Sequence, residues 1–203
     1  MTIQGRPKHT TGQASILSEQ HQKTFFTYLN GIRNPYLRDR NILIMTLNFK
    51  LGLRAKELAS LNLGDVINST GEVRDILRLT SEKTKGERHR DIPLTNKQVR
   101  LAIQVFITHH WLKETHSALF KTQRLNRFTP NSMQQRIGRL LREAGFDGKY
   151  SSHTGRRSFI TTLAQRGFDL NSIRELAGHS SLATTQRYIQ NDPERLAKML
   201  QAL

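Results

Sequence analysis

Apolar residues recur along this chain mostly at the three- and four-residue spacing of helices that bury one face. Residues 37–51 form the most apolar of these segments, which predicts a buried helix, and Gly52 is expected to end it. Helices are expected over the following ranges: 18–29, 37–51, 55–61, about 95–113, about 130–144, 153–166, 169–177, 181–189 and 193–202.

Capping residues mark several of the expected helix ends. Ser18 and Asp169 can each accept hydrogen bonds from the first unpaired N–H groups of the helix that follows. Asn131 or Ser132 is expected near the start of helix 130–144. Pro193 can open the last helix, because proline lacks the N–H that the first turn leaves unpaired.

A different pattern occupies residues 73–94. Apolar residues cluster at 73–79 and again at 92–94, and a charged segment that contains glycine separates the two clusters. We expect two or three antiparallel strands joined by a long basic hairpin tip. No other stretch has a strong strand pattern, and no repeat or internal linker divides the chain. The predicted fold class is therefore mainly α with a small antiparallel β-sheet.

The charge of the chain points to its partner. Its 203 residues include 32 Lys and Arg against 16 Asp and Glu, a formal net charge of +16, and the basic residues are spread over the whole length. A polyanion, with nucleic acid as the first choice, is the expected partner. RNA or an acidic membrane surface is the alternative. The absence of cysteine excludes disulfide scaffolds, thiolate metal sites and cysteine nucleophiles.

Residues 1–15 are polar and basic, and we expect them to form a flexible arm. They lack the apolar stretch of a signal peptide, and the chain has no apolar run of the length that spans a bilayer. We therefore expect a cytoplasmic protein, associated with the nucleoid when it binds DNA, and no membrane partner.

Two segments near the C-terminus bring together residues that suit phosphate chemistry. His153 and Arg156 are three residues apart, so one helix face would hold both, with Cβ atoms roughly 5 to 6 Å apart. His179 precedes Tyr188 by nine residues. Taken singly, each is more typical of an ordinary structural residue, such as a capping histidine or a packed tyrosine.

Upstream residues extend this set. Arg54 follows the turn at Gly52, and Glu57 three residues later can hold its guanidinium group, although an ordinary surface pair is the alternative. Lys83 and Lys85 lie in the expected hairpin tip, on an arm that could reach a bound substrate.

In chain order the set is Arg54, Lys85, His153, Arg156, His179 and Tyr188. This order resembles the tyrosine recombinases of the phage-integrase family. The segment LAGHSSLATTQRYI at 176–189 matches the Leu-Gly-His, Thr-Thr and Tyr pattern of the family, and the resemblance covers about residues 17–203. The chain departs from the family at Gly155, where the commoner pattern has leucine before the arginine; we expect this to weaken helix preference by about 1 kcal/mol without affecting the chemistry.

The resemblance implies a site-specific recombinase that cuts and rejoins DNA through a 3′-phosphotyrosine intermediate on Tyr188. Arg54 and Arg156 would stabilise the negative charge that develops on the non-bridging phosphate oxygens, because guanidinium is planar, always charged and bidentate. No metal or other cofactor is then expected. A type IB topoisomerase-like enzyme and a non-catalytic DNA-binding protein of the same fold are the alternatives.

The remaining residues have supporting roles in this interpretation. Lys85 would protonate the leaving 5′-oxygen, since its spacing to Pro93 matches the family, and Lys83 is the alternative acid. His153 and His179 would donate hydrogen bonds or protons at the scissile phosphate, and Glu57 would support Arg54. Residues expected to contact DNA are Lys83, Arg88, Arg90 and Arg157.

The expected organisation is a catalytic domain at 16–192 between the arm at 1–15 and a helix at 193–203, with no separate N-terminal DNA-clamping domain. Apolar residues on the last helix predict that it docks either on its own protomer or on a neighbour. The expected partners are double-stranded DNA, further copies of the chain in a dimer or tetramer, and accessory DNA-bending proteins. The chain is interpreted as a minimal recombinase, with a fragment of a longer one as the alternative.

Overall fold

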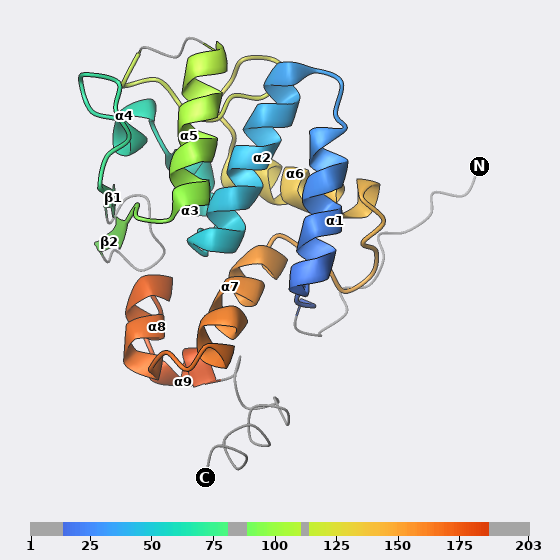
Figure 1. Cartoon of the computed structure of the whole chain (residues 1–203), viewed down its shortest axis with the longest axis vertical. Coiled ribbons are helices and arrows are strands. Elements are labelled where there is room, and N and C mark those ends of the chain that lie inside the picture. The colour runs from blue at the N-terminus through green and yellow to red at the C-terminus, as the bar shows by residue number, and fades with distance from the viewer. Residues whose placement is uncertain (1–13, 81–88, 111–113, 187–203) are drawn as a thin grey trace.

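The computed structural model describes residues 14–80, 89–110 and 114–186 (Figure 1). Four of the expected site residues, Lys83, Lys85, Arg88 and Tyr188, lie outside these ranges, as does the expected helix at 193–202.

The described chain is mostly helical with a two-stranded antiparallel sheet, which confirms the predicted fold class. The elements are α1 (Glu19–Asn30), α2 (Pro35–Lys50), α3 (Ala55–Ser60), α4 (Leu63–Val66), β1 (Ile76–Leu79), β2 (Arg90–Pro93), α5 (Lys97–His110), α6 (Pro130–Glu143), α7 (Thr154–Gln165), α8 (Leu170–Ala177) and α9 (Leu182–Gln186). The one-turn helix α4 was not predicted.

Side-chain caps explain where several helices begin. Ser18 caps α1 and Asp169 caps α8, as expected. The prediction for α2 began too late, because Asn34 accepts from the N–H of Leu37 at 3.0 Å and α2 starts directly after it. Asn131 and Ser132 lie in the first turn of α6, near its start as expected, and the N-cap residue is Thr129, which accepts from the N–H of Ser132.

The sheet pairs β1 with β2 from Ile76 opposite Pro93 to Leu79 opposite Arg90. Successive side chains of a strand point to opposite faces, so Arg90 and Ile92 share one face of β2, and both are buried. The alternation therefore turns Arg90 toward the interior of the protein.

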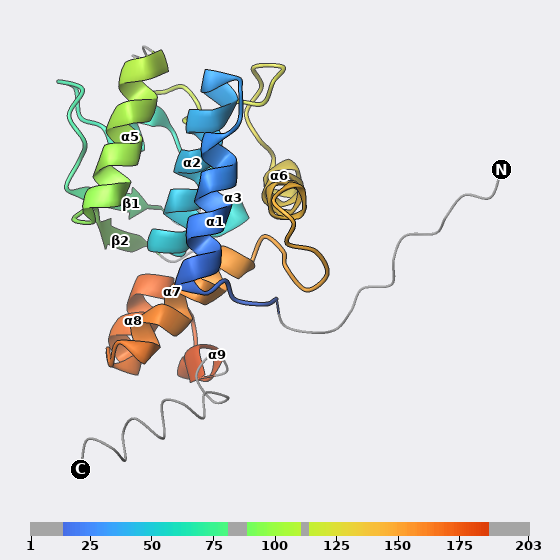
Figure 2. The same ribbon diagram turned by 45° about the vertical axis from the view of Figure 1, so that its right-hand side comes forward.

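Helix α2 lies between α1 and α5 and also contacts α3 and α7 (Figures 1 and 2). The main hydrophobic core contains residues of helices α1 through α6 and of the sheet. Helices α7 and α8 enclose a separate small cluster, whose buried residues are Ile160, Ala164, Ile173 and Ala177. Helix α7 connects the second cluster to the rest of the protein through its contacts with α2. None of the described helices is long and apolar enough to cross a membrane.

Candidate active site

Arg54 is the N-cap residue of α3, and it is fixed by the carboxylate one turn into that helix. Its backbone N–H donates to Glu57 Oε2 at 2.7 Å, and its Nη1 donates to Glu57 Oε1 at 2.8 Å. The Glu57 side chain is fully buried, whereas Arg54 keeps 22% of its side chain exposed. The expected contact between these residues is present, and it leaves part of the guanidinium accessible to a ligand.

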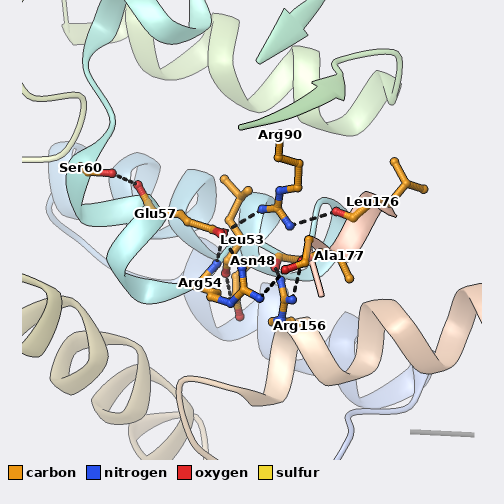
Figure 3. A network of polar contacts seen from close by, with 11 residues as sticks. Asn48, Leu53, Arg54, Glu57, Ser60, Arg90, Arg156, Leu176 and Ala177 are labelled. Atoms are coloured by element: carbon orange, nitrogen blue, oxygen red, sulfur yellow. Dashed lines mark hydrogen bonds and ion pairs between the residues drawn. The ribbon is translucent and has the colours of Figure 1, made fainter. Parts of the chain in front are cut away.

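Arg156 projects from the first turn of α7 and is buried. It donates to Gly52 O at 2.7 Å and to Ala177 O at 2.5 Å, so it connects the turn after α2 with the end of α8 (Figure 3). Gly52 has a φ of 65°, and a Cβ there would lie 2.6 Å from Phe159 Cδ1. Glycine is therefore required at this turn for both its conformation and its packing.

His179 follows the left-handed residue Gly178 at the end of α8 and is buried. Its Nδ1 lies 2.9 Å from Thr185 Oγ1. Burial, together with the charges of Arg156, Arg54 and Arg90, lowers the pKa of His179 to about 3, so the imidazole is neutral at pH 7. When Nδ1 accepts from the threonine hydroxyl, the proton resides on Nε2, which makes that nitrogen a hydrogen-bond donor.

The depressed pKa of His179 predicts a specific loss of stability in mild acid. Below pH 6.5 the unfolded chain binds a proton at this residue and the folded protein does not, so the contribution is present above that pH and is lost as the pH falls. We expect the unfolding free energy to decrease by up to about 2 kcal/mol between pH 7 and 5 from this residue. Urea denaturation of the wild type and of His179→Asn checks this, since the variant should lose less stability; parallel curves would contradict it.

Arg90 lies inside the site rather than on the hairpin surface where DNA contact was expected. Its side chain is only 5% exposed, and its Nη2 donates to Glu57 Oε2 at 2.8 Å. Its Nη1 donates to Leu176 O at 3.0 Å. Glu57 therefore holds two arginines, one on each carboxylate oxygen, with Arg54 on the other side (Figure 3).

The other described site residues lie nearer the surface. His153 is the N-cap residue of α7 and is exposed, so one helical turn separates an exposed histidine from the buried Arg156. Arg157 donates to Ala14 O at 2.6 Å. It thereby holds the start of the described chain against α7.

The network carries an excess of positive charge. Among the described residues it contains the guanidinium groups of Arg54, Arg90 and Arg156 and the single carboxylate of Glu57, while His179 is neutral. An anion at the exposed edge of Arg54 would offset this excess. Within the same ranges no group of three or more His, Asp or Glu side chains is arranged to hold a metal.

Sequence reasoning missed Asn48, which supports the site from α2. Its Nδ2 donates to Leu53 O at 2.8 Å, and its Oδ1 occupies the space beside Gly155, where a Cβ would lie 1.9 Å away. The glycine that departs from the family pattern therefore makes room for a polar side chain of α2. The departure itself was the available signal, because a missing side chain must be replaced by something in a packed interior.

Gly155→Ala is expected to lower the unfolding free energy by about 2 kcal/mol, because overpacking outweighs the gain in helix preference. Gly138→Ala in α6 is the matched control, since a Cβ there meets only the flexible end of Arg142 at 3.4 Å. That variant should be up to about 1 kcal/mol more stable than the wild type. Urea denaturation measures both, and equal effects of the two substitutions would contradict the steric argument.

The sequence matches the family model described as Phage integrase family over residues 16–195. Tyrosine recombinase XerC of Actinobacillus pleuropneumoniae serotype 7 (strain AP76) is 31% identical over 163 residues, which cover 80% of this chain and 51% of the relative. This chain thus spans about half the length of that curated relative.

Solved structures show the same fold. The crystal structure of XerA recombinase aligns with a TM-score of 0.75 at 24% identity, over 99% of this chain and 66% of that one. The catalytic domain of bacteriophage HP1 integrase aligns with a TM-score of 0.60 at 20% identity, over 93% and 95% of the two chains. With the family match over most of its length, this chain belongs to the phage integrase family.

Proposed function

We propose that this chain is the catalytic part of a site-specific tyrosine recombinase, which cuts and rejoins double-stranded DNA through a 3′-phosphotyrosine intermediate. The observation that carries the proposal is the meeting of Arg54 and Arg156 at the turn that bears His179. These residues come from three distant parts of the chain, and two of them are charged groups in a largely buried setting. The relative named tyrosine recombinase XerC supports the same reaction class.

The arginines suit the charge that develops during attack on a phosphodiester. As the nucleophile approaches phosphorus, negative charge grows on the non-bridging oxygens, and preorganised guanidinium groups stabilise it without reorganisation. Arg54 is already fixed by Glu57, and Arg156 by Gly52 O and Ala177 O. Neutral His179 would add a hydrogen bond from Nε2.

Tyr188 is the proposed nucleophile and Lys85 the proposed acid, with Lys83 as the alternative. Deprotonating a tyrosine of ordinary pKa at neutral pH costs about 4 kcal/mol, which nearby arginines reduce. The residue follows His179 by nine positions, and α9 carries the chain from that histidine toward it. A lysine on a hairpin can deliver a proton to the 5′-oxygen as that oxygen leaves.

The proposed partners are double-stranded DNA and further copies of the chain, in a dimer or tetramer, with accessory DNA-bending proteins. The net charge of +16 supports attraction to the phosphate backbone. The segment at 193–203 is proposed to pack between protomers, and an enzyme acting on chromosomal DNA would work in the cytoplasm at the nucleoid.

The test is to trap the covalent intermediate. The protein is incubated in EDTA with a pool of nicked duplexes whose central segment is randomised, so that the short piece beyond the cut diffuses away and religation stops. We expect an adduct that survives denaturation, and sequencing its DNA identifies the site. Absence of any adduct across the pool would contradict the proposal. Exchange of strands between two captured sites then distinguishes a recombinase from a topoisomerase, which relaxes supercoils without exchange.

A further inference from the structure

Arginines from three distant parts of the chain converge on the carbonyl end of α8 (Figure 3). Each donates to a different one of three consecutive carbonyl groups. The pairs are Arg90 with Leu176 at 3.0 Å, Arg156 with Ala177 at 2.5 Å, and Arg54 with Gly178 at 2.9 Å.

These bonds fix a turn that matters for the site. The last carbonyl groups of a helix have no partner within it and form the negative end of its dipole, so cations stabilise them. Directly beyond, the N–H of Gly178 donates to Glu175 O at 2.9 Å and the N–H of His179 donates to Arg174 O at 3.0 Å. The turn that presents His179 is therefore held both by its own backbone and by the arginines.

Arg90 is buried, as Arg156 is, whereas Arg54 is partly exposed. The Arg90 side chain is 5% exposed, against 22% for Arg54. It contacts Glu57 with one nitrogen and Leu176 O with another, so one side chain joins the carboxylate that orients Arg54 to the helix end that orients His179. Contact with a phosphate is not needed for this connection.

Arg90 reaches the end of α8 by packing directly against the backbone of Gly178. Gly178 has a φ of 63°, and a Cβ on it would lie 3.0 Å from Arg90 Cδ and 3.1 Å from Arg90 Nη1. The arginine passes directly against a backbone that has no side chain there. The Arg90 side chain therefore occupies space that a side chain at position 178 would need.

We propose that Arg90 is a positioning residue that sets the distance between Arg54 and His179, acting through Glu57 on the first and through Leu176 O on the second. The inference rests on the proposed recombinase function and adds a buried residue that controls the geometry of its active site. Without Arg90, the direct bond from Arg54 to Gly178 O would remain, but the second link between Arg54 and the end of α8, which runs through Glu57, would be lost.

The variants Arg90→Met and Arg90→Lys test this on the full chain. With the captured duplex at saturation, Arg90→Met should form the adduct about ten- to a hundredfold more slowly, since small displacements at a reacting centre have effects of that size. Its affinity for the same duplex should change less than about threefold, because many other phosphate contacts remain. Arg90→Lys should lie between, since one ammonium group can serve only one of the two acceptors.

Hydrogen exchange provides a readout that does not depend on DNA. In the free protein, the amides of Gly178 and His179 should exchange about tenfold faster in Arg90→Met than in the wild type. Arg100→Met is the matched control, because Arg100 also donates to backbone carbonyl groups, those of Val73, Arg74 and Leu94, at the end of the sheet opposite Arg90. That control should leave both amides and the adduct rate unchanged.

The outcomes separate this proposal from the proposed function. If the wild type forms no adduct, the proposed recombinase function is wrong. The positioning role is tested independently: equal hydrogen-exchange rates of the Gly178 and His179 amides in Arg90→Met and Arg100→Met would overturn it. If the wild type forms the adduct, an unchanged rate in a folded Arg90→Met overturns the role, as does an equal loss of rate and affinity. Should Arg90→Met fail to fold, the same comparison is made with Arg90→Lys.

Discussion

Tyr188→Phe is expected to abolish covalent attachment to DNA while leaving affinity for the duplex within about twofold of the wild type. In the proposed mechanism, the substitution removes the oxygen that would form the phosphotyrosine bond, whereas affinity for the duplex depends on the many basic residues of the chain. The adduct is measured on denaturing gels with the captured nicked duplex, and affinity is measured by titration of the intact duplex.

The other tyrosines of the chain are the controls. Burial, aided by the nearby carboxylate of Glu143, raises the pKa of Tyr28, and burial also raises the pKa of Tyr36, so both hydroxyls are held protonated. Phenylalanine at either position, or at Tyr150, should leave adduct formation intact. An adduct that persists in Tyr188→Phe and disappears in one of these controls would move the nucleophile to that residue.

Arg54→Ala is expected to lower the rate of adduct formation by on the order of a hundredfold or more, because in the proposed mechanism its guanidinium stabilises charge that appears mainly in the transition state. The fold should survive, since Glu57 keeps its bond to Arg90. Single-turnover kinetics at saturating DNA measure the rate, and equal losses of rate and affinity would place Arg54 in the binding surface instead.

Arg156→Ala should slow the reaction at least as much and should also destabilise the fold. Its side chain is buried, and its removal leaves Gly52 O and Ala177 O without these donors. Arg156→Lys separates the two effects, because lysine keeps a charge but cannot bind two acceptors as a planar fork. A lysine variant with the stability and the rate of the wild type would contradict the need for bidentate geometry.

Much of the fold could be predicted because its signals are local. The helix at α8, for example, follows from Asp169 as a cap and from apolar spacing, and both are readable within ten residues. The relation of Arg54 to Glu57 was also predictable, since three residues separate them on one helical turn.

The parts that could not be predicted depend on contacts between distant segments. In the sequence, Arg90 is one more basic residue of a predicted hairpin. Only the strand register shows that it lies with Ile92 on the buried face of β2. Asn48 reads as a polar position within a buried helix, and its fit against Gly155 appears only when α2 meets α7. The missing side chain at Gly155 signals that another group fills its place, but a single sequence does not identify that group as Asn48.

The small cluster between α7 and α8 has a consequence for how the protein opens. Its four buried hydrophobic residues are too few to hold these helices on their own, so their attachment depends on α2 and on the arginines that reach the end of α8. Among the described elements, this pair is therefore expected to detach before the main core unfolds. Detachment removes Arg156 and His179 from Arg54 in one event, so the free enzyme would alternate between a complete site and none. Under the proposed function, a phosphate group of DNA that contacts both arginines would favour the complete form, and this stabilisation would grow with the logarithm of the DNA concentration once the site is occupied.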